Sequence, residues 1–268
     1  MNGILIVNKP SGYTSRDVVN IVGKQLKTKK VGHTGTLDPL ASGVLVLTIG
    51  RYTKLGEVLT SYDKEYIAEV RLGIDTDTLD ITGNVLNTKD FSITKEDILN
   101  VFSLFIGNYH MEVPKYSAIK VNGKKLYEYA RNHISVELPI KDVRIRFRAK
   151  VEKGTYIRSL IRDMCASLGT VGVMSSLVRI KQGKFTLDEA QSLEDIKNNE
   201  YHLLNIKDVI NVQEYDLSDS EYKKVKNGNE IEISCKEEYL LLKYDNEEIA
   251  IYQKEDNFYK CYVMLKID

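Results

Sequence analysis

The pattern of apolar and polar positions predicts strands and helices in the first third of the chain. Residues 3–7 form a short apolar run ahead of the polar residues 8–12, which is typical of a buried strand that ends in a turn. A helix is expected over residues 14–26, because apolar residues recur on one side of it. The apolar run 44–49 predicts another strand, and the alternation over residues 65–72 predicts a half-buried one.

Three segments further along show equally clear periodicities. Residues 94–97 make an approximate capping box ahead of a core-forming helix that Gly107 should end. In residues 143–151, apolar side chains alternate with arginine and lysine, so a strand with one apolar and one cationic face is expected. That cationic face is either a solvent-facing stripe or a contact surface for RNA. Residues 157–168 carry apolar side chains at helical spacing, and Gly169 should close this helix.

The composition changes after about residue 212. Beyond it lie short alternating runs, separated by turns rich in Asn, Asp and Gly, at residues 230–233, 239–244, 249–252 and 259–265. We therefore expect a larger domain over residues 1–212 and a small β-rich domain over residues 213–268.

The overall composition is that of an ordinary globular protein. The 268 residues are 43% hydrophobic and 28% charged, which is enough to bury a full core. No stretch approaches the roughly 20 apolar residues of a membrane span, and the N-terminus lacks the layout of a signal peptide, so a cytoplasmic protein is expected. The three cysteines lie far apart, which argues against a disulfide framework or a CxxC metal site.

The net charge of zero conceals an uneven distribution. Residues 1–60 hold eight basic and three acidic residues, and residues 141–184 hold eleven and three. Residues 185–268 instead hold ten basic and twenty acidic residues. The two basic blocks could face a polyanion such as nucleic acid while the acidic tail stays away from it, although surface charge without such a role is also common.

The segment from Gly32 to Leu45 is the clearest candidate for chemistry. It places Asp38 and His33 in a loop with three glycines and Pro39, so a carboxylate is held at a set angle on a backbone that another molecule can approach closely. Its glycines match neither GxxxxGK[ST] nor GxGxxG, and the chain has no GxSxG or HExxH. A carboxylate nucleophile or base remains, which can act without cofactor or metal.

Two other features bear on the chemistry of this loop. The acids of residues 75–80 lack the glycine and the final acid of an EF-hand loop, so no metal is expected there. Arg158 lies in the first turn of a predicted helix, where a cation opposes the helix dipole, so it is not placed there for helix stability. A buried or anion-facing guanidinium and a plain surface arginine both remain open. A glycosidase would need a second positioned acid, and nothing ties the 75–80 cluster to Asp38.

Taken in order, several blocks of the chain resemble the tRNA pseudouridine-55 synthases of the TruB family. The resemblance covers nearly the whole chain and is carried by residues 3–5, 8–15, 32–43, 64–66, 76–78 with Asp80 and Gly83, 114–118, 153–158 and 177–179. Two departures stand out. Val151-Glu152 precede Lys153-Gly154 where the family usually has Cys or Ser, and the segment 132–151 is shorter than is typical.

The resemblance implies a role for individual residues. Asp38 would be the catalytic aspartate, Tyr66 would stack on the target uracil and handle the proton at C5, and Arg158 would pair with Asp38. His33 would fill the place that the flipped base leaves in the RNA. The substrate pocket would be lined or supported by further residues of the same blocks, namely Lys9, Pro10, Gly32, Thr34, Gly35, Tyr156 and Leu177.

The resemblance also implies a fold, a reaction and a partner. The expected fold is α+β: a mixed, mostly antiparallel central sheet with flanking helices, followed by a compact PUA-like β-rich domain. The expected enzyme is a monomeric isomerase that flips the T-loop uridine at position 55 of tRNA out of its stack and converts it to pseudouridine, with no cofactor and no metal. Two alternatives remain: a non-catalytic RNA-binding or tRNA-folding protein, and a guide-dependent subunit that modifies ribosomal RNA.

Overall fold

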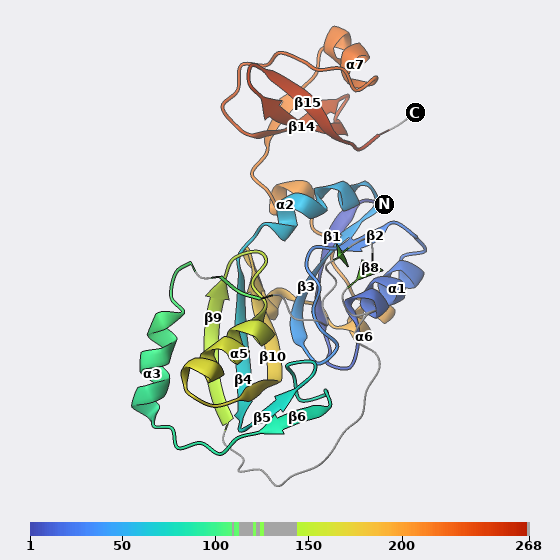
Figure 1. The fold of residues 1–268 in the computed structure, drawn as a ribbon. Helices are drawn as coiled ribbons and strands as arrows, with labels where there is room; N and C mark the ends of the chain where they lie inside the picture. Colours follow the sequence, from blue (N-terminus) through green and yellow to red (C-terminus); the bar gives the residue numbers. More distant parts are fainter. Residues whose placement is uncertain (109, 113–119, 122–123, 126–143, 267–268) are drawn as a thin grey trace. The chain divides into compact units, whose positions relative to one another are not determined.

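A computed structural model describes residues 1–108, 110–112, 120–121, 124–125 and 144–266. The predictions that fall on residues 114–118 lie outside these described residues. The described chain separates into two compact units, one formed by residues 1–39, 43–61 and 185–268 and the other by residues 40–42 and 62–184. Both contain helices and strands, in accord with the expected α+β class (Figure 1). No helix within the described ranges is long and apolar enough to cross a membrane.

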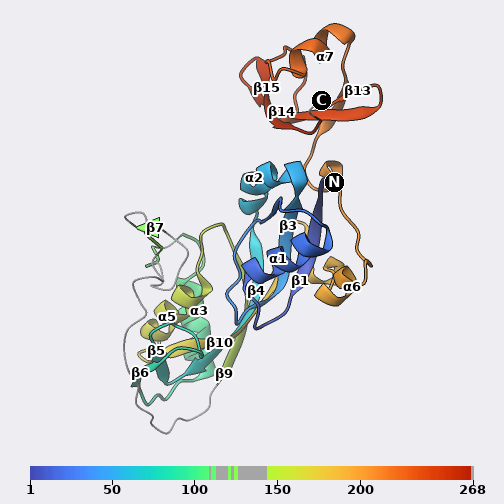
Figure 2. The ribbon, with the colours of Figure 1, turned by 90° about the vertical axis from the view of Figure 1, so that its right-hand side faces the viewer.

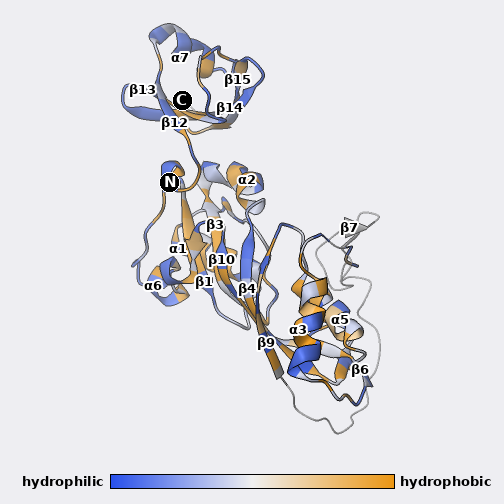
Figure 3. Ribbon diagram, turned by 90° about the vertical axis from the view of Figure 1, so that its left-hand side faces the viewer, coloured by the Kyte–Doolittle hydropathy of each residue, from blue (hydrophilic) through white to orange (hydrophobic). Residues whose placement is uncertain are grey.

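The first unit begins with three antiparallel strands and a helix. Strand β3 (Ser42–Ile49) pairs along its length with β1 (Gly3–Lys9), and its last residues pair with β2 (Val31–His33). The residues of β1 and β3 are almost all buried, and Figure 3 shows hydrophobic colouring on both strands. The predicted helix is α1 (Ser15–Gln25), which begins at the reciprocal hydrogen bonds of Thr14 and Asp17.

Short helices and turns complete this part of the first unit. Their bounds are η1 (Gly50–Leu55), α2 (Gly56–Thr60), β11 (Phe185–Thr186), η2 (Leu187–Glu189), α6 (Leu193–Lys197) and η3 (Ile206–Asp208). Helix α6 packs against α1, and Gln25 of α1 donates to the Lys197 carbonyl and to Asn199.

The C-terminal residues of the same unit form a separate four-stranded sheet. Its order is β12 (Gln213–Asp216), β13 (Tyr239–Tyr244), β14 (Glu247–Glu255) and β15 (Phe258–Met264), with α7 (Asp219–Val225) beside it. It has its own buried cluster, which includes Leu240, Leu242 and Tyr259. The domain boundary at residue 212 remains a prediction.

The prediction of a strand over residues 230–233 was wrong. Of these residues only Ile231 forms a bridge, to Tyr259, and the Ile233 carbonyl accepts from the Cys235 N–H two residues on instead of from a neighbouring strand. Strand β12 was missed, and it runs parallel to β13.

The second unit is built on a sheet of three long antiparallel strands. Strand β4 (Lys64–Leu72) lies between β10 (Gly172–Gln182) and β9 (Arg144–Val151). Helix α5 (Ile157–Ser167) packs on β4 and β10, and α3 (Lys95–Leu104) contacts α5; Figures 1 and 2 show the two helices near these strands. Two small hairpins are also present, formed by β5 (Ile74–Thr76) with β6 (Val85–Thr88) and by β7 (Lys120–Val121) with β8 (Lys124–Lys125).

Helix α3 begins at the predicted capping box of Thr94 and Asp97 but buries less than expected. Of its residues only Val101 is buried, and Leu104 is 68% exposed. Apart from Val101, only Ile98 and Phe102 of the helix are partly buried within the described structure, so α3 contributes little to the core there.

Candidate active site

The loop that carries Asp38 is held by the first residue of α1. The buried Ser15 hydroxyl accepts a hydrogen bond from the Leu37 N–H at 2.9 Å and donates to the Leu37 carbonyl at 3.1 Å. Both backbone groups of the residue before Asp38 are therefore fixed by one side chain. Asp38 itself is half-buried.

Lys9 and Gly12 hold the other side of the same loop. The Lys9 side chain is completely buried, and its ammonium donates to the carbonyls of Pro10, Tyr13 and Pro39 at 2.9, 2.6 and 3.5 Å. The Gly12 N–H also donates to the Pro39 carbonyl, at 2.8 Å. Because a buried ammonium must be satisfied by acceptors, these contacts favour the supporting role of Lys9 over direct contact with a substrate. Asp38 thus lies between two residues whose backbones are tied down.

The residues between β2 and Asp38 divide into a buried and a more accessible group. Thr34 is fully buried, and both its N–H and its hydroxyl donate to the Val46 carbonyl of β3. His33 is half-buried, and its Nδ1 accepts from the Gly35 N–H at 3.4 Å. Gly35 has a φ of +152°, a conformation that favours glycine. Thr34 therefore anchors the loop, while His33 and Gly35 lie at its partly exposed part.

The second unit holds the other two predicted catalytic residues. Tyr66 on β4 and Arg158 on α5 are each 6% exposed. Arg158 is therefore a buried guanidinium, not a surface arginine, and its Nη1 donates to the Thr78 carbonyl at 3.0 Å. Asp38 belongs to the first unit, so the pairing of Arg158 with Asp38 remains a prediction.

Leu177 and Tyr156 also belong to the second unit. Leu177 of β10 is buried and lies opposite Ala68 of β4. Tyr156 is half-buried and directly precedes α5, with its N–H donating to the Met111 sulfur. Arg158, Tyr156 and Leu177 are thus carried by a helix and a strand that pack together.

The sequence interpretation gave no role to three buried polar residues beside Tyr66, although two of them lie in the blocks 64–66 and 177–179 of the resemblance. They are Lys64 on β4 and Arg179 and Gln182 on β10, all at most 7% exposed. The Arg179 Nε donates to the Tyr66 hydroxyl at 3.2 Å, and its Nη1 donates to the Gln182 Oε1 at 3.3 Å. The alternation of β4 could have revealed Lys64, which shares its inward face with Tyr66. No local pattern reveals Arg179 or Gln182.

Burial has a clear electrostatic effect on Lys64. Desolvation lowers the pKa of its ammonium to about 8, and the neighbouring positive charge of Arg179 acts in the same direction. The ammonium donates to the Tyr62 carbonyl at 2.5 Å.

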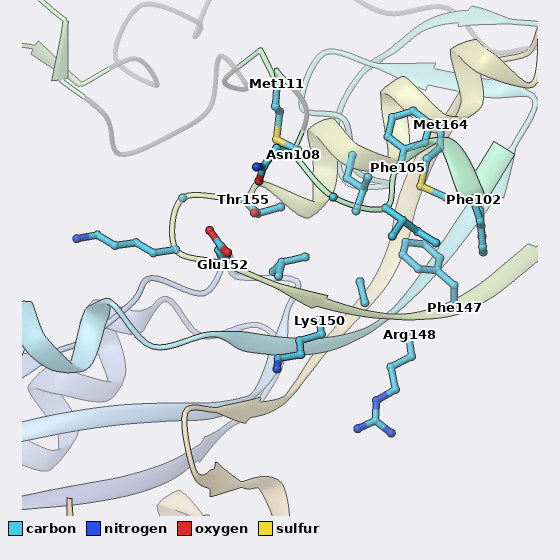
Figure 4. A pocket seen from close by; sticks show the side chains of 17 residues that line it. Phe102, Phe105, Asn108, Met111, Phe147, Arg148, Lys150, Glu152, Thr155 and Met164 are labelled. Carbon is cyan, nitrogen blue, oxygen red and sulfur yellow. The ribbon is translucent and has the colours of Figure 1, made fainter. Parts of the chain in front are cut away.

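The cationic face predicted on residues 143–151 is present but is matched by acids. On β9, Arg146, Arg148 and Lys150 form salt bridges with Glu69, Glu65 and Asp63, the first and last at 3.9 and 3.5 Å. Figure 4 shows Arg148 and Lys150 projecting away from Phe147, as the alternation requires. The pairing favours a solvent-facing stripe over an RNA contact.

The acidic segment of residues 75–80 forms a structural turn. The Asp80 carboxylate accepts from the Thr78 hydroxyl, the Thr82 N–H and the Thr82 hydroxyl at 2.5–3.0 Å. Leu79 adopts a positive φ of 63° within it. Among the described residues, no group of three or more His, Cys, Asp or Glu could hold a metal ion.

A hollow of about 740 Å³ opens in the second unit between α3, β9 and α5. Phe102, Phe105, Phe147 and Met164 line it, as Figure 4 shows. It contains none of the predicted catalytic residues, and its lining adjoins residue 109, which lies outside the described chain. Its apolar lining does not identify it as a reaction site.

A second hollow, of about 440 Å³, lies along α1 in the first unit and is strongly cationic. We call it the α1 hollow; its charged lining residues are Arg16, Lys24, Lys27 and Lys29. All four are exposed, and no salt bridge involves them within the part of the chain that the structure describes. Lys27 has a positive φ of 52° at the end of the helix, where glycine is usual. The hollow is suited to bind phosphate groups.

The sequence of this chain is similar to a known protein family and to individual members of it. Residues 24–157 match the model of the N-terminal domain of the TruB family of pseudouridylate synthases. A tRNA pseudouridine synthase B of Alkaliphilus oremlandii is 43% identical over 86% of this chain and 83% of its own length. The protein of the same name from Bacillus subtilis is 42% identical over 85% and 82%.

Solved structures show the same fold. A crystal structure described as a Cbf5-Nop10-Gar1 complex aligns with a TM-score of 0.66 at 25% identity, covering 98% of this chain and 84% of that one. A structure of the archaeal box H/ACA sRNP Nop10-Cbf5 complex aligns with a TM-score of 0.63 at 25% identity, covering 94% and 78%. The α+β architecture expected from the sequence is thereby confirmed.

Proposed function

Since this chain belongs to the TruB family of pseudouridylate synthases, we propose that it converts the T-loop uridine at position 55 of tRNA to pseudouridine. The observation that carries the proposal is the fixation of the Asp38 loop by Ser15, Lys9 and Gly12, which ties down the backbone on both sides of one carboxylate. The relatives described above, at more than 40% identity, are named tRNA pseudouridine synthase B, which supports pseudouridine formation on tRNA.

The reaction is an isomerisation, so its atoms balance within the substrate. The N1–C1′ bond of uridine breaks, the uracil rotates, and a C5–C1′ bond forms; C5 loses a proton and N1 gains one. Asp38 is the covalent nucleophile in this scheme, which requires no redox partner. Arg158 pairs with its carboxylate, and a cation beside a carboxylate keeps it ionised.

The uracil must leave its stack before its C1′ bond can be reached, at a cost of a few kcal/mol. Tyr66 offsets this cost by stacking on the flipped base and takes part in proton transfer at C5. His33, at the partly exposed part of the loop, fills the space that the base leaves in the RNA. Pro10, Gly32, Gly35, Tyr156 and Leu177 line or support the pocket, with Lys9 and Thr34 supporting from within.

The α1 hollow supports an RNA substrate. Its four cations have no acidic partner in the described structure, whereas those of β9 are matched by Asp63, Glu65 and Glu69. Phosphates of the T arm would be attracted to the cations that are not already neutralised. We further propose that the enzyme acts as a monomer on free tRNA, in the cytoplasm, without a metal or cofactor.

The decisive experiment is turnover on a T-arm stem-loop with tritium at C5 of the target uridine. Tritium release reports loss of the C5 proton, which pseudouridine formation requires. The wild-type chain should release it in proportion to pseudouridine formed, and Asp38→Asn should abolish release while binding to the stem-loop is largely kept. Appreciable turnover by Asp38→Asn would contradict the assignment of the nucleophile.

The same assay separates the two rival functions. A non-catalytic RNA-binding protein would bind the stem-loop and release no tritium. A guide-dependent subunit would be inactive on free tRNA and would require an added guide RNA. The Cbf5 structures named above resemble this chain in fold. Their 25% sequence identity to this chain is well below the 43% identity of the tRNA pseudouridine synthase B from Alkaliphilus oremlandii.

A further inference from the structure

A cluster of four buried polar side chains lies on the inward face of β4 and β10. We call it the Tyr66 cluster; it consists of Lys64, Tyr66, Arg179 and Gln182. The antiparallel register places Arg179 directly opposite Tyr66 and Gln182 directly opposite Lys64. Side chains in such positions are near neighbours on one face of a sheet.

A β-bulge creates this arrangement. The register shifts between Arg179 and Lys181, so that Lys181 lies opposite Glu65 and Gln182, not Lys181, lies opposite Lys64. Gln182 is consequently fully buried beside Arg179, while Lys181 is only partly buried. Without the extra residue, the strand would place a second lysine in the cluster and remove the acceptor that Gln182 gives to Arg179.

Two contacts hold the phenol of Tyr66 in one orientation. The Arg179 Nε donates to its oxygen at 3.2 Å, and the centre of the guanidinium lies 5.4 Å from the ring centroid. The Gln182 Oε1 accepts from the Arg179 Nη1 at 3.3 Å and so fixes the guanidinium in turn. Because a guanidinium carries only donor groups, the phenol oxygen must accept this bond, and the Tyr66 O–H points elsewhere.

A guanidinium is a costly choice for a position that is 2% exposed. Removing a charge from water carries a large penalty, and an apolar side chain would pack against Tyr66 without it. Packing alone therefore does not explain Arg179. Its donors give it a directional role that an apolar side chain lacks, because they bond to both the Tyr66 oxygen and the Gln182 Oε1.

We propose that Arg179 is a positioning residue for Tyr66, held in place by Gln182. The inference rests on the proposed function, in which Tyr66 stacks on the flipped uracil and handles the proton at C5. Arg179 acts through Tyr66 and makes no bond to the substrate in this scheme. It adds to the site a second residue of the 177–179 block, distinct from Leu177.

The test is a double-mutant cycle in turnover. Arg179→Gln should lower single-turnover rate at saturating RNA at least tenfold while changing the Kd for the stem-loop by less than threefold. In the Tyr66→Phe background, the same substitution should cause no further loss, because the oxygen that Arg179 holds is gone. An equal loss in both backgrounds, a loss confined to Kd, or no loss would overturn the proposal.

A milder variant covers the case in which Arg179→Gln fails to fold. Gln182→Leu keeps Arg179 and removes the Gln182 oxygen that accepts from it. This substitution should lower the single-turnover rate two- to fivefold in the wild-type background and should have no effect in the Tyr66→Phe background. Arg179→Lys should recover less than half of the rate that Arg179→Gln loses, because an ammonium cannot reproduce the planar set of guanidinium donors. Full activity of Gln182→Leu and Arg179→Lys together would contradict positioning by Arg179.

The cycle also distinguishes this inference from the proposed function. If the wild-type chain releases tritium and Asp38→Asn does not, the function stands whatever Arg179 does. If the wild-type chain is inactive, the coupling is measured in urea unfolding instead, where Arg179 and Tyr66 substitutions should be non-additive. Additive effects there would overturn the contact independently of catalysis.

Discussion

Ser15 and Leu37 are joined by two hydrogen bonds, although 22 residues separate them in the chain. One hydroxyl accepts from the Leu37 N–H and donates to the Leu37 carbonyl, and it does so from the first residue of α1. The start of the helix thereby sets the backbone immediately before Asp38. Stability and catalysis should both depend on this single oxygen.

Replacing Ser15 with Ala should leave both backbone groups of Leu37 without their partner. We expect a loss of about 1–3 kcal/mol in unfolding free energy and a fall in kcat of roughly 10- to 100-fold, because small displacements of a reacting group are costly. Urea unfolding and turnover on the stem-loop measure the two effects. Ser103→Ala, which removes an exposed hydroxyl bonded to the Asn100 carbonyl, should change neither.

Lys9→Met tests whether Lys9 supports the loop or contacts RNA. Loss of the ammonium leaves the carbonyls of Pro10, Tyr13 and Pro39 without this donor, so the unfolding free energy should fall by about 1–3 kcal/mol. The Kd for RNA, measured under conditions where the variant is folded, should change little. Lys30→Met, at an exposed position, is the matched control. Unchanged stability with a weakened Kd would instead indicate direct contact with the substrate.

We expect the lysines of the α1 hollow to contribute to RNA affinity and the cations of β9 not to. The triple substitution Lys24→Gln, Lys27→Gln and Lys29→Gln should weaken binding and reduce the slope of log K against log salt by about 2–3 in magnitude. The control triple Arg146→Gln, Arg148→Gln and Lys150→Gln removes cations that are already matched by acids. Its salt slope should stay close to that of the wild type. A larger effect from the control triple would place the RNA on β9 instead.

The buried Lys64 should make the protein more stable as the pH rises. A lysine in an ion pair has the opposite effect, because its pKa is raised in the folded state. The pKa of Lys64 is lowered to about 8 in the folded chain, mainly by burial, against about 10.4 in the unfolded chain. Between these values the unfolded state binds more protons, so the contribution of Lys64 to stability rises with pH and its penalty is fully present below pH 8.

The measurement is a comparison of the wild type with Lys64→Met. Other groups also titrate in this range. The quantity to measure is therefore the unfolding free energy of the wild type minus that of Lys64→Met, determined by urea unfolding at a series of pH values from 7 to 10. This difference should shift in favour of the wild type as the pH rises above about 8. A difference that is flat over this range would show that Lys64 is not desolvated in the folded protein.

Much of the chain could be predicted because its signals are local. Helix α1 follows the apolar periodicity of its residues, and β4 and β9 follow the alternation of their side chains. The Asp38 loop was recognisable from its glycines and Pro39, since these residue types restrict or free the backbone wherever they occur. Arg158 was suspected from its unfavourable place in the first turn of a helix, and it is indeed buried.

The surroundings of these residues required the tertiary structure. Strand β10 was missed because Ser175 and Ser176 interrupt its apolar pattern, and the bulge beyond Arg179 cannot be read from spacing. Whether Lys9 contacts RNA or holds a loop depends on the carbonyls that surround its ammonium, which come from Pro10, Tyr13 and Pro39. The residue types of the loop were enough to single out Asp38 as the candidate carboxylate, because backbone preference is a property of each residue. The side chains that hold that loop and the Tyr66 ring became visible in the folded chain alone, because strand register and hydrogen-bond partners depend on residues far apart in the sequence.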